Sequence, residues 1–343
     1  MTDAALERIS DRIAKQLDAE LSHGGEWLAH LLNNGLDQLP MPGAGNTLER
    51  WRALAAVGQF DLSLTKLYEG HTDALAILQE IEPTSAKPAA GAWCVWAAEA
   101  PGTRVLMHRD GNTGVRLSGA KHWCSGAMTA DHALLTAFSE DGSGPHLVAI
   151  DLKQPGITVD ATRWKAVGMA GSMSVNVAFD GATGRCVGTP GQYLARPGFW
   201  HGGAGLAACW YGGAVGIALA LRTSLLGNCS GTAGYKQAAL GKVELALAET
   251  AATLRQAAAW IDANPALDAS RAALTTRLSA EKCAKLVLDE VGKAMGATPF
   301  CLNEKFAQAA ADLPVFIRQS HAERDFAALG ERSLKNLDSP WTL

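Results

Sequence analysis

Hydrophobic and polar positions change their spacing twice along the chain, and these changes divide it into three zones. In the first zone apolar residues such as Leu6, Ile9 and Ile13 recur every three or four positions, which is the period of a helix with one buried face. Between about residues 91 and 182 the apolar runs become short and strand-like, as at 174–179 (SVNVAF), and lie between glycine-containing turns. We therefore predict helices, then several short antiparallel strands, then helices again.

The third zone consists of long apolar and alanine-rich segments that predict bundle helices. The predicted helices cover residues 203–226, 233–262, 267–297 and 312–336. We therefore predict an α+β, mostly α, protein of three domains. These are an N-terminal helical domain, a small central antiparallel β domain of barrel or sandwich type and a C-terminal four-helix bundle, at residues 1–85, 86–198 and 199–343.

Composition and charge exclude several classes of protein. The chain has 30 Lys and Arg against 34 Asp and Glu, so it lacks the basic excess typical of nucleic-acid binding. Seven cysteines without a C-x-x-C pair argue against a disulfide framework or a metal site.

With no secretory signal pattern at the N-terminus, we expect a cytoplasmic protein. Residues 197–221 carry no charge and are long enough to span a membrane, but seven glycines favour a helix buried in a bundle.

One segment of the β zone contains candidate chemistry. Residues 117–126 read LSGAKHWCSG and are followed by Ala130-Asp131. This segment resembles the pattern L-x-G-x-K-x-W-I-[TS]-N-G…A-D of the acyl-CoA dehydrogenase superfamily, whose domain order also matches the predicted one. In that family the Trp packs on the flavin ring and the hydroxyl lies near the reactive flavin nitrogen. The resemblance therefore implies these roles for Trp123 and Ser125.

Other local resemblances follow in the family's order. Residues 98–103 (AEAPGT) are similar to T-E-P-x-x-G-S, which contacts the flavin pyrimidine edge and diphosphate, and 168–172 (GMAGS) are similar to G-x-r-x-S. Residues 213–218 (GAVGIA) and the pair Asp61 and His71 also fit. The resemblance implies a flavin, FAD or alternatively FMN. The expected cofactor-binding residues are Trp96, Ala98, Thr103, Trp123, Ser125 and Gln237.

The chain departs from the family at its catalytic base and at its diphosphate grip. A dehydrogenase needs a carboxylate to remove the substrate α-proton, but the two family positions for that carboxylate hold Ser320 and Leu206 here. The family's R-x-x-F-G is replaced by residues 227–232 (GNCSGT), with Gln237 matching a downstream Gln. FMN or weakly bound FAD therefore stays open.

Three residues are candidate catalytic groups. His71 and His321 resemble the histidines of the oxygenase branch, which stabilise a flavin C4a-hydroperoxide, and a histidine can move protons near neutral pH. Glu69, within Tyr68-Glu69-Gly70-His71, is the best alternative base. The alternative is a structural histidine for each of His71 and His321, and an exposed helix position for Glu69.

Three functions are therefore weighed. The first is a flavin-dependent oxidoreductase that oxidises an acyl thioester or related carbonyl compound by proton abstraction and hydride transfer. The second is a flavin-dependent monooxygenase on the same fold, and the third is a non-catalytic binding protein. The resemblance implies a small-molecule substrate, a homodimer or homotetramer, and a flavin reductase or electron-transfer flavoprotein as partner, with neither nucleic acid nor membrane.

Overall fold

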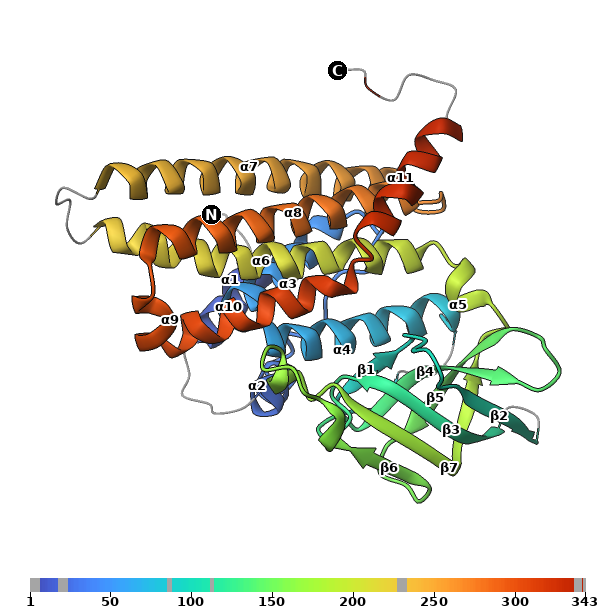
Figure 1. The fold of residues 1–343 in the computed structure, drawn as a ribbon. Coiled ribbons are helices and arrows are strands. Elements are labelled where there is room, and N and C mark those ends of the chain that lie inside the picture. The colour runs from blue at the N-terminus through green and yellow to red at the C-terminus, as the bar shows by residue number, and fades with distance from the viewer. Residues whose placement is uncertain are drawn as a thin grey trace, which may run out of the picture. The chain divides into compact units, whose positions relative to one another are not determined.

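The computed structural model describes residues 7–17, 24–84, 88–111, 114–226, 233–335 and 341. They form two compact units (Figure 1). Unit 1 takes its residues from Met1–Leu39 and Ser63–Phe199, and unit 2 from Pro40–Leu62 and Trp200–Leu343. The predicted division of the chain at residues 85 and 198 stays a prediction.

Unit 1 combines a few helices with all the strands of the described residues. Its helices are α1 (Ile9–Gln16), α2 (Gly24–Asn33), most of α4 (Leu62–Ile81) and the short α5 (Gln192–Ala195). Its strands are β1 (Trp93–Trp96), β2 (Val105–Asp110), β3 (Gly114–Cys124), β4 (His132–Ser139), β5 (Pro145–Asp151), β6 (Ile157–Asp160) and β7 (Val175–Val187). Two short 3-10 turns, η1 (Ala161–Arg163) and η2 (Ala170–Ser172), lie between β6 and β7.

Five of the strands close into a small barrel. The hydrogen-bonded order runs β4-β2-β3-β7-β5 and returns to β4, while β1 adds to β4 and β6 adds to β7. Alternate residues of each strand face the barrel core, as Val115 and Leu117 do on β3. Closure leaves no free edge within the ring, which protects the strands from pairing with other chains.

The prediction of a purely antiparallel β domain is wrong in one respect. Strands β1 and β2 both run parallel to β4, whereas the other pairs are antiparallel. Trp96 pairs with Leu135 at the end of β1, and Leu106 pairs with Phe138 on β2. Strands β1 and β2 therefore follow one another along the same edge of β4, and residues 97–104 form a loop between them.

Among the described residues of unit 2, the regular secondary structure is helical, and turns and loops connect the helices. It contains α3 (Thr47–Phe60), nearly all of α6 (Gly198–Leu226), α7 (Ala233–Ala263), α8 (Ser270–Met295), α9 (Thr298–Leu302), α10 (Glu304–Phe316) and α11 (Glu323–Lys335), with a 3-10 turn η3 (Ile317–Gln319). Helices α7 and α8 run side by side (Figure 1). This unit is the counterpart of the predicted bundle.

Glycines allow α3 and α6 to approach each other backbone to backbone. A Cβ added at Gly212 would lie 2.2 Å from the Ala55 carbonyl oxygen, and one added at Gly216 would lie 2.7 Å from the Gln59 carbonyl oxygen. Neither contact is possible for a side chain, because real Cβ atoms do not come this close to backbone. Close packing against α3 thus explains the glycines of α6.

Helix α6 is the described helix that is long and apolar enough to cross a membrane by length and composition. However, 67% of its most apolar window is buried inside the protein. Such burial is typical of a core helix in a soluble protein rather than of a lipid-facing span.

The predicted helix over 312–336 is wrong, because two helices and a break occupy this stretch. Helix α10 ends at Phe316, and α11 begins only at Glu323. Between them Ala322 has a left-handed backbone with φ of 47°, which interrupts a right-handed helix. The Asp325 carboxylate, in the first turn of α11, accepts the backbone N–H of His321 at 3.0 Å, so local side-chain bonding favours a new helix start here.

Candidate functional site

The Trp123 side chain is turned outward by an irregularity in the barrel. Strands β3 and β7 lose their register between Lys121 and Cys124, as at a β-bulge, which re-aims the residues within it. Trp123 has φ of 59°, a conformation that costs a non-glycine residue about 1 to 3 kcal/mol. Its indole is 53% exposed, whereas Lys121 and Cys124 are buried. A strained backbone thus exposes a large aromatic side chain at the surface of the barrel.

Ser125 is held firmly two residues further along. Its carbonyl accepts the indole N–H of the buried Trp96 at 2.9 Å, and the next backbone N–H, that of Gly126, donates to the Ser172 carbonyl at 3.1 Å. The Ser125 hydroxyl lies 2.7 Å from the Ser174 hydroxyl. The structure therefore brings together two segments that the sequence singled out separately, 117–126 and 168–172.

The loop between β1 and β2 is anchored by a buried lysine. Lys121 is 3% exposed, and its ammonium donates to Glu99 Oε1 at 2.9 Å and to Thr136 Oγ1 at 2.9 Å. Ala98 is exposed beside this anchor, and the half-buried Thr103 turns its hydroxyl back to the Ala100 carbonyl at 3.3 Å. Lys121 thereby fixes the loop that the sequence associated with the flavin pyrimidine edge.

His71 is buried on α4 with a partner at each ring nitrogen. The backbone N–H of Trp93 donates to Nδ1 at 3.0 Å, so Nδ1 carries a lone pair, and Nε2 lies 3.3 Å from Asp37 Oδ2. Burial raises the pKa of Asp37, but the hydrogen bonds from His71 and Gln38 outweigh it and hold that pKa below 3.8. These contacts join α4 to β1 and to the segment after α2.

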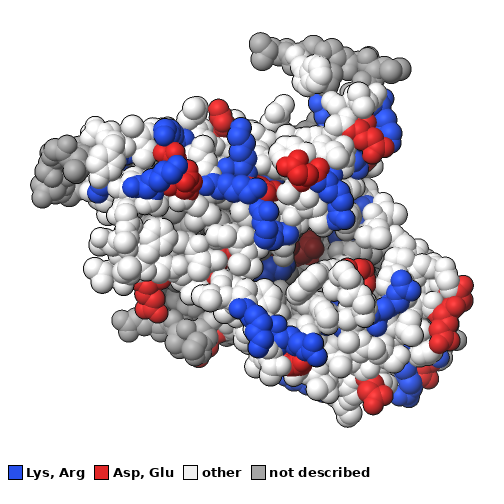
Figure 2. All heavy atoms as spheres, in the orientation of Figure 1, with Lys and Arg blue, Asp and Glu red and all other residues white. Residues whose placement is uncertain are grey.

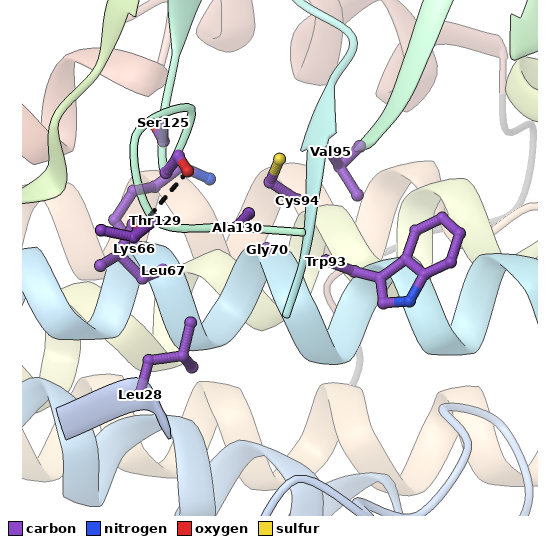
Figure 3. A pocket seen from close by; sticks show the side chains of 11 residues that line it. Leu28, Lys66, Leu67, Gly70, Trp93, Cys94, Val95, Ser125, Thr129 and Ala130 are labelled. Atoms are coloured by element: carbon purple, nitrogen blue, oxygen red, sulfur yellow. Dashed lines mark hydrogen bonds between the residues drawn. The ribbon is translucent and has the colours of Figure 1, made fainter. Parts of the chain in front are cut away.

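Glu69 lies two residues before His71 on α4 and forms an ion pair with Lys66 at 2.6 Å. It is 8% exposed rather than a solvated surface carboxylate. Lys66 also lines a cavity of about 10 Å³, which is room for a single water molecule. Figure 3 shows Leu28 on one side of this cavity and Ser125 and Thr129 on the other.

The remaining predicted residues belong to unit 2. His321 is 57% exposed and its Nδ1 lies 3.3 Å from Asp325 Oδ1. Ser320 is buried and donates to the same carboxylate at 3.4 Å, Leu206 is half-buried on α6, and Gln237 is exposed on α7. Residues 227–232, where the family's diphosphate-gripping pattern is missing, lie outside the described residues.

Two thiols beside the site are unreactive by environment. Burial raises the pKa of Cys124, and although the Lys121 charge offsets part of this effect, the pKa reaches about 12. Burial also raises the pKa of Cys94 well above its usual value. A thiolate is the nucleophilic form of cysteine, so neither residue offers a nucleophile near neutral pH.

Sequence reasoning missed the support beneath Ser125 and the anchor of the 97–104 loop. Ser174 was read only as part of a strand, and the motif of 117–126 suggested no partner for Lys121. The contact of Ser174 with Ser172 had no periodic signal, because Ser172 ends a 3-10 turn and Met173 between them has a left-handed backbone with φ of 47°. The Lys121–Glu99 pair had no local signal, because 22 residues separate the partners.

Comparison with known proteins identifies the fold. No protein-family model and no curated protein matches this chain. Among solved structures, TdsC from Paenibacillus sp. A11-2 in complex with FMN and indole is 16% identical over 97% of this chain and 98% of that chain, with a TM-score of 0.81. KijD3 in complex with FMN and dTDP-3-amino-2,3,6-trideoxy-4-keto-3-methyl-D-glucose is 17% identical over 97% and 92%, with a TM-score of 0.79.

A nitrososynthase from Micromonospora carbonacea var. africana is also similar, at 18% identity over 96% of this chain and 94% of that chain, with a TM-score of 0.75. The chain therefore has the acyl-CoA dehydrogenase-like fold, as the sequence motifs predict. At this level of identity the likeness establishes the fold, and the chemistry rests on the residues themselves.

Proposed function

We propose that this protein is a flavin-dependent oxidoreductase acting on a small molecule. The observation that carries the proposal is the strained turn at residues 122–126, which exposes the Trp123 side chain and, two residues further along, fixes the Ser125 hydroxyl against Ser174. An aromatic face beside a fixed hydroxyl fits the ring of a flavin, whose electronics a protein tunes by stacking and by hydrogen bonds to ring nitrogens.

The residues present fit a flavin at this place. Trp123 would cover the ring, the Ser125 hydroxyl would bind a ring nitrogen, and the loop with Ala98 and Thr103 would hold the pyrimidine edge and the diphosphate, with Trp96 supporting Ser125. The bound flavin would supply the capacity to accept or deliver a hydride or electrons. Gln237 contributes to the nucleotide side in FAD, and FMN needs no such contact, so both cofactors are compatible with the proposal.

The first candidate reaction is oxidation of an acyl thioester or related carbonyl compound. It requires a base that removes the substrate α-proton. Glu69 and His321 are the proposed groups, because Glu69 accepts a proton when its pair with Lys66 opens and His321 has a solvent-accessible ring. His71 supports the same region by tying β1 to α4 through its two ring nitrogens.

The second candidate reaction is monooxygenation. It is favoured by the absence of a carboxylate at the family's two base positions, which hold Ser320 and Leu206. TdsC is described as a dibenzothiophene monooxygenase and the Micromonospora protein as a nitrososynthase. In this reaction His71 and His321 are the proposed protein groups that hold or move protons near neutral pH.

A single pair of anaerobic and aerobic experiments separates the reactions. The flavin-loaded protein is mixed without oxygen with a panel of acyl-CoAs, and bleaching with an enoyl product supports the first reaction. Oxygen consumption with supplied reduced flavin and an oxygenated product, without bleaching, supports the second. A protein that takes up neither FAD nor FMN contradicts both and leaves the non-catalytic binding protein.

Partners follow from the electron balance of each reaction. A monooxygenase needs a flavin reductase to supply reduced flavin, and a dehydrogenase needs an acceptor such as an electron-transfer flavoprotein.

We propose a cytoplasmic homodimer or homotetramer, consistent with exposed apolar side chains such as Leu245 and Trp260 on α7. On the face drawn in Figure 2, basic and acidic side chains are interspersed, which differs from the basic stripe that nucleic acid requires.

A further inference from the structure

Behind Ser125 lies a continuous chain of three buried hydroxyls. Ser125 Oγ lies 2.7 Å from Ser174 Oγ, and Ser174 Oγ lies 2.8 Å from Ser172 Oγ. Ser172 is fully buried, and the other two serines are each 8% exposed. The chain ends at a backbone carbonyl, because Ser172 Oγ lies 2.7 Å from the oxygen of Met169.

The carbonyl at the end sets the direction of every bond in this chain. A carbonyl oxygen only accepts, so the single hydroxyl proton of Ser172 points to Met169. Ser174 must then donate to Ser172, since two hydroxyl oxygens at 2.8 Å need a proton between them. The proton of Ser174 is thereby used, and Ser125 must donate to Ser174.

The reverse direction is excluded by the geometry at the inner end. It would place the lone pairs of the Ser172 hydroxyl against those of the Met169 carbonyl at 2.7 Å, in a site where water cannot intervene because Ser172 has no exposure. The Met169 carbonyl also accepts the backbone N–H of Ser172 at 3.1 Å, so the cost of the reverse direction is the repulsion between the two oxygens at 2.7 Å when no proton lies between them. Direction is therefore a property of the fold rather than of the ligand.

Ser125 consequently presents only lone pairs to whatever binds in front of it. Its hydroxyl proton is committed to Ser174, so it accepts a hydrogen bond from a ligand and does not donate one. A flavin differs in this respect between its oxidation states. The central ring nitrogen that is a bare acceptor in the oxidised molecule carries a proton, and is a donor, in the reduced molecule.

Resting on the proposed flavin site, we propose that Ser172 and Ser174 are positioning residues that fix Ser125 as a hydrogen-bond acceptor, so that the site selects reduced over oxidised flavin. Ser125 alone would rotate its hydroxyl to suit either state. The two inner serines remove that freedom, and the selectivity of the site for one redox state is set by residues that do not touch the ligand.

The test compares affinities for the two states of one cofactor. FMN is titrated into the protein, oxidised in air and reduced with dithionite under anaerobic conditions, and the ratio of the two dissociation constants is measured for the wild type, Ser174→Ala and Ser172→Ala. Either substitution frees the Ser125 proton to point outward. We expect each to lower the preference for reduced FMN roughly tenfold, which corresponds to a midpoint potential of bound FMN about 30 mV more negative.

Two further variants keep the test specific. Ser174→Thr retains the hydroxyl and should keep the wild-type ratio. Ser118→Ala, on the strand β3 that precedes Ser125 but outside the chain of hydroxyls, should leave the ratio unchanged. If Ser174→Ala and Ser172→Ala bind FMN with the wild-type ratio, the inference is overturned while the flavin site stands. If the wild type binds neither state of FMN or FAD, the proposed function itself fails.

Discussion

At the scale of single residues, the site is defined by side chains whose environments differ sharply over a few positions. Trp123 is exposed, Cys124 is buried with its pKa raised to about 12, and Ser125 is hydrogen-bonded on its backbone and its hydroxyl. The resemblance to a known pattern predicted the roles of the first and third. The resemblance could not reveal the hydroxyl chain behind Ser125. The direction of its hydrogen bonds is set by the carbonyl of Met169, which is distant from Ser125 in the sequence.

Replacing the exposed indole should weaken flavin binding. We expect Trp123→Ala to raise the dissociation constant for FMN about tenfold or more, because an aromatic face contributes both buried area and stacking. Trp123→Phe keeps a ring and should lose less. Trp260, 39% exposed on α7, provides the matched control Trp260→Ala. Fluorescence titration measures all four proteins, and equal affinity of Trp123→Ala and wild type would remove this residue from the site.

Thiol reactivity should follow burial. At pH 8 an alkylating reagent should modify Cys301, which is exposed, and spare Cys94 and Cys124, whose pKa values are raised by burial. Peptide mapping by mass spectrometry before and after unfolding reads out each cysteine. Rapid modification of Cys124 in the folded protein would contradict the environment described for the 122–126 turn.

At the scale of elements, the sequence predicted helices, strands and their order, but not how strands pair or where a helix breaks. Strands β1 and β2 lie along one edge of β4 and run parallel to it, a choice made by long-range packing that periodicity does not record. The break before α11 depends on Ala322 adopting a left-handed backbone and on the Asp325 carboxylate. Alanine and aspartate are not strong helix breakers, so the apolar pattern continues across the break and predicts a single helix.

The anchor of the 97–104 loop should be measurable as stability. Lys121→Met removes the buried donor of Glu99 and Thr136, and we expect a loss of about 1 to 3 kcal/mol in the free energy of unfolding. Lys153→Met is the matched control, because its pair with Asp131 has a lysine side chain that is 76% exposed, and such pairs contribute at most about 1 kcal/mol. Denaturant unfolding compares the two. A loss no larger than that of Lys153→Met would show that Lys121 does not anchor the loop.

The link between α4 and β1 should respond to acid. Hydrogen bonds from His71 and Gln38 hold the pKa of Asp37 below its usual value in the folded protein. The stabilising contribution of this carboxylate is therefore complete above the unfolded-state pKa and is lost as pH falls through the folded-state pKa. Asp37→Asn should therefore be less stable than the wild type at pH 7, and this difference should shrink below about pH 4. Thermal unfolding across pH measures it. A difference independent of pH would mean that the charge on Asp37 does not stabilise the fold.

At the scale of the whole molecule, two units share one chain, and the fold is that of acyl-CoA dehydrogenase-like enzymes. The glycines that favour a buried helix over residues 197–221 are explained in part by the close backbone contacts of Gly212 and Gly216 with α3. The order of motifs was sufficient to predict this fold. The order of motifs was insufficient to locate a catalytic base, because the two positions where the family carries one hold Ser320 and Leu206. These two residues are compatible with both candidate reactions, oxidation of a carbonyl compound and monooxygenation.

The measurement that tests the central claim most directly is equilibrium binding of flavin to the wild-type protein. Purified protein is titrated with FMN and with FAD in both oxidation states, followed by flavin fluorescence and absorbance. The account predicts saturable binding at one site per chain, with the reduced form bound more tightly. Absence of saturable binding of either flavin in either state would contradict it.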